Sequence, residues 1–544
     1  MNKKRIELTK FLPLVFIAIF LNSLSLLNAM PPKPGVFKDD FVSGEKTNIS
    51  RQKSAYNTQS QINSSLSAIY INSTIKPLIV LVEFPDVKFS SPTPSGYENW
   101  LFAKTGKSLY TFYTENSGGK LSVNDGGVYP TIITADWNMS VYATDRTTFA
   151  AEVAEKLVKS GFDLSNFDAN NDGIVDALII IHAGNAQEST GKSTDIWSFK
   201  DSMNYSYPAI TPYKIVDYMV LAETSPLGTF CHEFGHILGL PDLYNTLSGN
   251  STCGKWDLMD AGGWTDDGNT PSHLSAWCKK YLGWGNENII EEKMSNLKIT
   301  PTETIDNYSD NNEFYKINIF GNSKEYFLLE YRNQTGFDSQ LPDKGMLVWH
   351  IDETLLDSRL DSNKINTGSP HNSIDLITAD GTIAGYSEDR VSATHLFRTG
   401  NVFDYPFNKS FDGVNSNISL SNFESNIDYM NFSASVLKSA EKVTVLQFFN
   451  YPNPTYNSKT TFKLELNKQI IKNTEFKIYD LSGKLVYKRN ITYLDLISST
   501  DLSFVYRFDW DCMDTKNNKV ASGVYIYFVN SENVKKTGKL AVLN

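Results

Sequence analysis

Cysteine and histidine are scarce in this chain, with four and seven residues among 544. A disulfide-stapled scaffold needs far more cysteine, so the fold has to rest on hydrophobic cores. Cys231, Cys253 and Cys278 share one region and can form at most one disulfide there, whose pairing the sequence leaves open. Cys512 stands apart from them. Cys231 precedes a histidine, but a buried or disulfide-bonded thiol is favoured over a metal ligand.

Positive charge is also in deficit, with 50 Lys and Arg against 61 Asp and Glu and a formal net charge of −11. The first 29 residues carry a net +3, so the rest of the chain carries −14. An acidic chain without a basic cluster is a poor partner for nucleic acid or for an anionic membrane surface. We therefore expect no nucleic-acid partner.

Long apolar runs are absent after the first 29 residues, so we expect no transmembrane segment in the mature chain. The beginning has a different pattern, because four basic residues precede an apolar stretch at 11–27. That order predicts a Sec signal peptide over residues 1–29, cut after Ala29. The alternative is a membrane anchor, which is disfavoured because polar residues interrupt the stretch. These residues are Asn22, Ser23 and Ser25.

A chain of this length usually forms several domains, and the pattern changes along it. Residues 30–75 are rich in Ser, Asn, Gln and Lys and are interpreted as a linker or pro-segment. Continuous apolar runs at 77–84 and 177–181 are typical of buried strands, and helical segments lie between them. This mixture predicts an α/β or α+β catalytic domain over 76–287.

The remaining chain has a strand-like pattern. Short alternating segments over 288–440 are separated by Gly, Asp, Asn and Pro, and they predict a β-rich sandwich or an all-β extension of the preceding domain. The pattern resets near residue 440. Residues 446–544 then predict a compact β-sandwich.

A candidate metal site lies in a predicted helix over 229–240, where residues 232–236 read His-Glu-Phe-Gly-His. Residues four apart share a helix face, so His232 and His236 can offer two imidazoles to one zinc ion. Zinc acidifies its water and polarises a peptide carbonyl, and Glu233 is placed to accept the proton. The alternative is a core helix with two structural histidines. The five other histidines are interpreted as packing or surface residues.

A third ligand is expected shortly after the helix. Gly239 can take the positive φ that turns the chain back, and Asp242 follows six residues after His236. The pattern resembles the long zinc motif of metzincins, with Asp in place of the third His. Met259 is expected to form the Met-containing turn below such a site. Asp242 as a ligand is a hypothesis.

A second metal is predicted upstream. Oxygen-bearing residues alternate around a Gly turn, as in the first nine positions of an EF-type calcium loop. The twelfth position is Ile179 rather than Glu, so a complete EF-hand is excluded, and the calcium ion would be structural. The alternative is an ordinary Asp/Asn/Gly turn. The expected ligands are Asp168, Asn170, Asp172, the carbonyl of Ile174, and Asp176.

These motifs, in this order, resemble the immune inhibitor A-like metallopeptidases. The matching segments lie at 113–123, 168–184, 229–244, 255–259, 281–284, 341–353 and 375–380. The resemblance implies secreted proteolysis of protein or peptide substrates, zinc ligation by His232 and His236, and a catalytic role for Glu233.

The C-terminal segment resembles a type IX secretion sorting domain. The matching segments lie at 451–454, 478–484, 510–511, 521–527 and 536–540. With the signal peptide, this resemblance implies Sec export followed by the type IX machinery, and a secreted or surface location in a Gram-negative bacterium. The alternative is a generic adhesive or carbohydrate-binding β-sandwich.

The sequence therefore predicts a secreted zinc-dependent endopeptidase. Two other functions stay open: a surface-binding protein on a decayed peptidase fold, and a zinc hydrolase that acts on something other than peptides. The first is disfavoured because Glu233 and both histidines are present.

Overall fold

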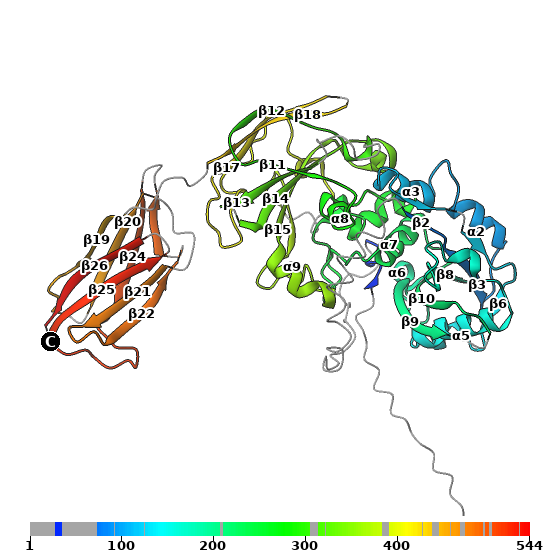
Figure 1. Cartoon of the computed structure of the whole chain (residues 1–544), viewed down its shortest axis with the longest axis horizontal. Helices are drawn as coiled ribbons and strands as arrows, with labels where there is room; N and C mark the ends of the chain where they lie inside the picture. Colours follow the sequence, from blue (N-terminus) through cyan, green and yellow to red (C-terminus); the bar gives the residue numbers. More distant parts are fainter. Residues whose placement is uncertain are drawn as a thin grey trace, which may run out of the picture.

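The computed structural model of the chain describes fifteen stretches (Figure 1). They are residues 28–34, 73–91, 93–124, 126–206, 210–304, 314–320, 322–382, 391–426, 428–437, 445–456, 459–467, 474–492, 495–499, 503–531 and 534–543. The predicted signal peptide lies outside them except for its last two residues, as does most of the predicted linker or pro-segment.

The N-terminal region is built on a mixed sheet with the order β1-β9-β10-β8-β3-β5. Strands β10, β8 and β3 run parallel, whereas β9 is antiparallel to β10 and β1 is antiparallel to β9. The bounds are β1 Asn28–Ala29, β3 Leu78–Glu83, β5 Gly127–Val128, β8 Leu178–His182, β9 Phe199–Ser206 and β10 Lys214–Ala222. Two short strands, β6 Ile133–Thr134 and β7 Ile174–Val175, pair with β3 and β10.

The two predicted buried strands are present as β3 and β8. Their side chains alternate between the two faces of the sheet, and each face packs into a different core. Ile79 and Leu81 join the core that contains α7, while Leu78, Val80 and Val82 join the core that contains α5. Both faces are covered, so these strands are continuous apolar runs rather than alternating ones.

Helices flank this sheet on both sides (Figure 1). Their bounds are α2 Pro94–Leu101, α3 Leu109–Asn116, α4 Met139–Tyr142, α5 Arg146–Lys159, α6 Gln187–Thr190, α7 Leu227–Ile237 and α8 Ala276–Tyr281. The predicted helix over 229–240 is α7, which begins two residues earlier and ends three residues earlier. Its C-terminal end is followed by Gly239, whose φ of 93° is the positive value that the sequence suggested.

The β-rich region forms a five-stranded sheet, β11-β13-β14-β15-β16, and a three-stranded sheet, β12-β18-β17. The bounds are β11 Glu287–Ile289, β12 Met294–Ile299, β13 Phe314–Ile319, β14 Asn322–Arg332, β15 Gly345–Asp352, α9 Glu353–Arg359, β16 Ile374–Ile377, β17 Ile418–Ser425 and β18 Met430–Val436. Side chains of β14 and β15, such as Leu328 and Trp349, pack in the same core as Trp256 and Trp277 of the N-terminal region. The two regions therefore share one hydrophobic core.

A buried ionic cluster also joins them. Arg332, at the end of β14, is fully buried and donates from Nε and Nη2 to the carboxylate of Asp338 at 2.6 and 2.9 Å. Its Nη1 donates to the Trp256 carbonyl at 2.9 Å. Although burial lowers the pKa of Arg332, the charges of Asp338 and Glu330 raise it above its ordinary value. A buried charge this well satisfied fixes β14 against the segment that precedes Met259.

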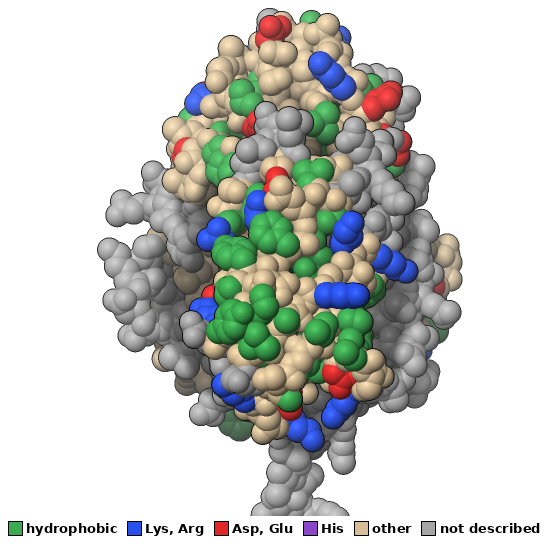
Figure 2. All heavy atoms as spheres, turned by 90° about the vertical axis from the view of Figure 1, so that its left-hand side faces the viewer, with side chains coloured by type: hydrophobic (Ala, Val, Ile, Leu, Met, Phe, Trp, Pro, Cys, Tyr) green, Lys and Arg blue, Asp and Glu red, His purple; other side chains and the backbone are tan. Residues whose placement is uncertain are grey.

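The C-terminal module packs two four-stranded sheets, β19-β20-β24-β23 and β22-β21-β25-β26, around a core of its own. The bounds are β19 Val445–Tyr451, β20 Thr460–Leu466, β21 Thr474–Asp480, β22 Leu485–Ile491, β23 Leu496–Ser499, β24 Phe504–Trp510, β25 Gly523–Ser531 and β26 Val534–Val542. Figure 2 views the molecule from the side of this module, where apolar side chains are interspersed with Lys and Arg. Exposed apolar residues in the module include Phe449, Tyr451 and Ile497.

Among the described residues, no helix is long and apolar enough to cross a bilayer. All four cysteines are free and buried, which settles the pairing that the sequence left open.

Candidate metal centre

Helix α7 places two imidazoles side by side. His232 and His236 are one turn apart on this helix, both are buried, and their Nε2 atoms lie 3.2 Å from each other. The turn at Gly239 then brings Asp242 back to them, so that its Oδ1 lies 3.1 Å from each Nε2. The structure thus brings together the three residues that the sequence proposed as ligands, and they form one group of possible metal donors.

The hydrogen bonds of the two imidazoles decide which nitrogen carries the proton. Nδ1 of His232 lies 2.9 Å from the Leu258 carbonyl, and Nδ1 of His236 lies 2.7 Å from the Leu240 carbonyl. A carbonyl oxygen only accepts, so each Nδ1 donates and each Nε2 of a neutral ring presents a lone pair. Three acceptors therefore face one another: two imidazole nitrogens and the carboxylate of Asp242.

A bound cation would remove the repulsion among these three acceptors. In a tetrahedral zinc site with bonds of about 2.0–2.1 Å, neighbouring ligand atoms are about 3.3 Å apart. The three separations here, 3.1, 3.1 and 3.2 Å, are close to one triangular face of such a tetrahedron. An aspartate carboxylate is ionised at neutral pH, so Asp242 adds a negatively charged oxygen to the two imidazole nitrogens. The donor set fits zinc.

The β-rich region supports the third donor through Asn363. Its Nδ2 donates to Asp242 Oδ2 at 2.6 Å, and its Oδ1 accepts from the Asp242 backbone N–H at 2.8 Å. Asn363 has a φ of 49°, a left-handed conformation that Asn tolerates better than most residues. No local motif marks this residue, which lies 121 positions after Asp242, so its role could not be predicted from the sequence.

Met259 lies directly beneath α7. A Cβ at Gly235 would lie 2.7 Å from the Met259 sulfur, so a larger residue there would displace the Met259 side chain. The Met259 carbonyl accepts from Leu243 N–H at 2.8 Å, while the preceding Leu258 carbonyl holds His232. The turn around Met259 thus supports both the helix and the loop that carry the donors.

Glu233 projects from the same helix and is fully buried. Its Oε1 accepts from the Met30 backbone N–H at 2.7 Å, while its Oε2 makes no hydrogen bond of normal geometry among the described residues, with the Lys200 backbone N–H nearby. Burial, followed by the charges of Asp242 and Glu188, raises the pKa of Glu233 well above its ordinary value. A carboxylate beside the three donors is placed to hold a proton.

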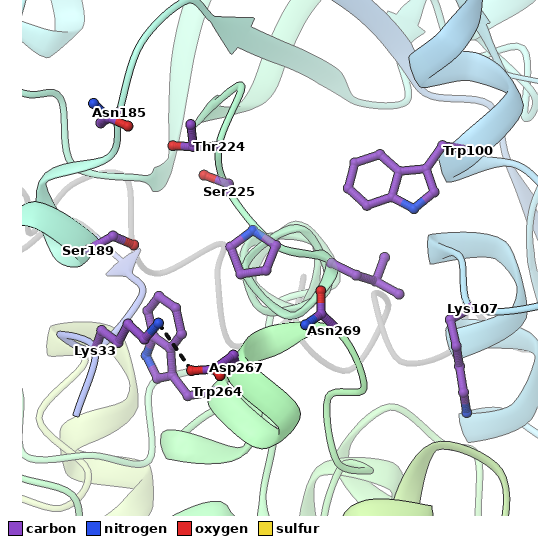
Figure 3. Close-up of a pocket in the computed structure, with 12 residues that line it drawn as sticks. Lys33, Trp100, Lys107, Asn185, Ser189, Thr224, Ser225, Trp264, Asp267 and Asn269 are labelled. Carbon is purple, nitrogen blue, oxygen red and sulfur yellow. Dashed lines mark ion pairs between the residues drawn. The ribbon is translucent and has the colours of Figure 1, made fainter.

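A pocket of about 580 Å³ lies at the N-terminal end of α7 (Figure 3). Lys33 and Trp264 line one side of it, and Trp100 and Lys107 line the other. Lys33 Nζ lies 3.1 Å from an Asp267 carboxylate oxygen, an exposed pair that contributes little stability.

In the predicted calcium loop, the carboxylates already have hydrogen-bond donors. Its carboxylates accept from the loop's own backbone: Asp168 from the N–H groups of Asp172 and Gly173, and Asp176 from Ala169 and Lys76. The loop does not form a second group of metal donors among the described residues. The structure therefore gives no support to calcium, which stays an untested prediction.

The other histidines have structural partners. His273 is buried and its Nε2 lies 2.7 Å from a Glu115 carboxylate oxygen. Burial lowers the pKa of His182 to about 4. His350, His371 and His395 lie in the β-rich region, where His395 Nδ1 accepts from the Trp256 indole at 3.0 Å. None of the five joins the group of three donors.

Comparison with known proteins agrees with this geometry. Residues 71–286 match the family described as immune inhibitor A peptidase M6, catalytic domain, and residues 450–505 match the secretion system C-terminal sorting domain. The N-terminal region is thus a metallopeptidase domain. Within that class, it is a catalytic domain of the M6 (immune inhibitor A) family, joined in this chain to a type IX secretion sorting domain. Both resemblances stated from the sequence are confirmed.

Two curated relatives are similar over part of their length. Immune inhibitor A of Bacillus thuringiensis subsp. alesti is 28% identical over 284 residues, 40% of this chain and 41% of its own length. Pre-pro-metalloprotease PrtV of Vibrio cholerae serotype O1 is 25% identical over 276 residues, 38% of this chain and 30% of its own length. The chain therefore spans well under half of either relative.

A solved structure, PorZ of the Porphyromonas gingivalis type IX secretion system, is 15% identical with a TM-score of 0.16, covering 41% of this chain and 36% of its own.

The role of Asn363 can be tested with a variant that keeps its backbone unstrained. Asn363→Gly removes the carboxamide but tolerates the positive φ. We expect its zinc affinity, measured by competition with a chelating dye, to fall about 10–100-fold, as when other residues that orient a metal ligand are lost.

The matched control is Asn417→Gly, since Asn417 also has a positive φ, 57°, but is exposed at the start of β17. Its zinc affinity should equal that of the unmodified protein. Equal affinities in both variants would show that Asn363 does not support the site.

Proposed function

We propose that this protein is a secreted zinc-dependent endopeptidase. His232, His236 and Asp242 would hold the zinc ion, and Glu233 would act as the general base. The observation that carries the proposal is the meeting of three lone-pair donors within 3.2 Å of one another, with a buried carboxylate from the same helix beside them.

Each group has a separate role in the proposed reaction. Zinc, when bound, polarises the scissile carbonyl and makes a water molecule more acidic. Glu233 takes the proton from that water on its Oε2 and can return it to the leaving amine. Asn363 and the Leu258 and Leu240 carbonyls hold the three donors in place. The M6 family match and the two relatives named as an immune inhibitor and a metalloprotease support this activity.

A Glu233→Gln variant tests the proposed base. The amide keeps the shape of the side chain but cannot accept the proton, so we expect casein hydrolysis to fall at least about a hundredfold, the lower end of typical general-base contributions. Zinc content should be unchanged. A chelator should abolish hydrolysis by the unmodified protein, and added zinc should restore it.

Glu424→Gln is the control, because Glu424 is exposed on β17 and lies outside the site. It should retain full activity. Full hydrolysis by Glu233→Gln would contradict the proposed base, and hydrolysis of a non-peptide substrate alone would identify a different zinc hydrolase.

We also propose that the chain is exported in two steps, through Sec and then the type IX machinery. The match of residues 450–505 to the sorting domain supports the second step. The module has its own core and its own pair of sheets, as expected of a unit that machinery could recognise separately. The first step rests on the predicted signal peptide.

Deletion of residues 446–544 tests the sorting role in a bacterium with type IX secretion. We expect the truncated chain to remain in the cells, in the periplasm, as measured by immunoblotting of cell fractions. Fusing 446–544 to a periplasmic passenger should export that passenger. Undiminished export of the truncated chain would contradict the sorting role.

A further inference from the structure

The loop that carries Asn363 connects α9 to β16 and is called the Asn363 loop, residues 360–373. Besides the two bonds between Asn363 and Asp242, the Asn363 carbonyl accepts from the Thr246 hydroxyl at 2.8 Å. Loops are ordinarily more mobile than the helices and strands that they connect. A loop that orients a metal donor therefore needs supports of its own, and these supports bear on the metal site.

Asn366 ties the same loop to the residue that follows Asp242. Its Nδ2 donates to the Leu243 carbonyl at 2.8 Å, and its Oδ1 accepts from the Ile374 N–H at 3.1 Å. Asn366 is fully buried, so both ends of its carboxamide need such partners. The chain from Asp242 to Thr246 is thus held at three residues by one loop of the β-rich region.

One arginine closes the Asn363 loop. Arg359 is the last residue of α9, and its Nη1 donates to the Ile365 and His371 carbonyls at 3.0 and 2.9 Å. Its Nη2 donates to the Ser369 carbonyl. A planar guanidinium presents its N–H groups in a fixed fork, whereas the ammonium of lysine is a point charge on a flexible stem. Arg359 therefore joins the beginning of the loop to its end.

A stacked imidazole anchors the end of the loop. The ring of His371 stacks on Phe411, with centroids 3.9 Å apart and planes at 14°. His371 Nε2 lies 3.1 Å from one carboxylate oxygen of Asp352. The other oxygen of Asp352 caps α9 by accepting from two backbone N–H groups. The start of α9 and the end of the loop are thus held to the same carboxylate, with Arg359 between them.

We propose that Arg359 is a positioning residue of the metal site: by closing the Asn363 loop, it holds the carboxamide that orients Asp242. The inference rests on the proposed zinc peptidase function, because it assigns a support to one of the three metal donors. The side-chain hydrogen bonds of Arg359 to described residues all stay within the loop. Arg359 therefore acts on Asp242 through Asn363 and not by direct contact.

The physical effect of Arg359 is to order the loop before zinc binds. Without the guanidinium, the backbone of the loop has more conformations available to it. The bond from Asn363 to Asp242 must then offset a larger loss of conformational entropy each time the site forms around the ion. Removal of Arg359 should therefore weaken zinc binding although the three donors are unchanged.

Arg359→Ala in the full chain tests the role. We expect its zinc affinity, measured by competition with a chelating dye, to fall about tenfold, the lower end of the loss when residues that orient a metal ligand are removed. Hydrogen exchange of the Asp242 amide, which donates to Asn363 Oδ1, should rise at least about tenfold in the zinc-free protein. His371→Ala, which removes the stacked anchor, should change both quantities in the same direction and serves if Arg359→Ala does not fold.

The matched control is Arg398→Ala. Arg398 is also a half-buried arginine of the β-rich region, but it pairs with Asp343 and lies outside the loop. Neither quantity should change in it. Equal changes in the two arginine variants would assign the effect to a general loosening of this region and would overturn the proposal. Unchanged exchange and affinity in both Arg359→Ala and His371→Ala would overturn it as well.

A double variant separates positioning from a general loss of stability. If Arg359 acts through Asn363, Arg359→Ala should lower zinc affinity at most about twofold when Asn363→Gly is already present, because coupled residues are not additive. Losses that multiply in full would show that Arg359 acts independently of Asn363 and would contradict the proposed route.

The exchange measurement depends neither on zinc nor on hydrolysis. Faster exchange of the Asp242 amide in Arg359→Ala, in a protein that binds no zinc, would uphold the support of Asp242 by the loop. That outcome would contradict the proposed peptidase function instead.

Discussion

Three lone pairs that meet without a proton between them are the constraint on which this structure depends. The backbone carbonyls of Leu258 and Leu240 hold the protons of His232 and His236 on the far side of each ring. The near sides, together with the Asp242 carboxylate, would repel one another in a buried site unless a cation bound there. Helix α7, the turn at Gly239 and the turn around Met259 can all be understood as the means of holding these atoms together.

The same constraint explains why the β-rich region cannot be regarded as a separate appendage. Asn363 fixes the carboxylate of the third donor, and Arg332 ties β14 to the segment that leads to Met259. Both contacts come from beyond residue 286, where the match to the M6 catalytic domain ends. In this chain the peptidase site is therefore built from two sequence regions that share a hydrophobic core.

The sequence predicted the features that depend on residues close together in the chain. The spacing of His232 and His236, and the Gly that follows, specify two donors on one helix face and the return of Asp242. Continuous apolar runs predicted β3 and β8 because both faces of those strands are covered. Contacts between distant segments could not be predicted: Asn363 and Met30 lie in stretches without a motif, and only the folded chain brings them to Asp242 and Glu233. The calcium loop stays a prediction, since an oxygen-rich pattern also suits a turn whose carboxylates accept from its own backbone.

The claim at the centre of this account is that Asp242 completes the metal site. Its most direct test is the zinc content of Asp242→Ala after dialysis, measured by mass spectrometry beside the unmodified protein and Asp357→Ala, whose side chain is exposed on α9. The account predicts one zinc per chain in the unmodified protein and in Asp357→Ala, and a large loss in Asp242→Ala. One full equivalent of zinc in Asp242→Ala, with undiminished affinity, would contradict it.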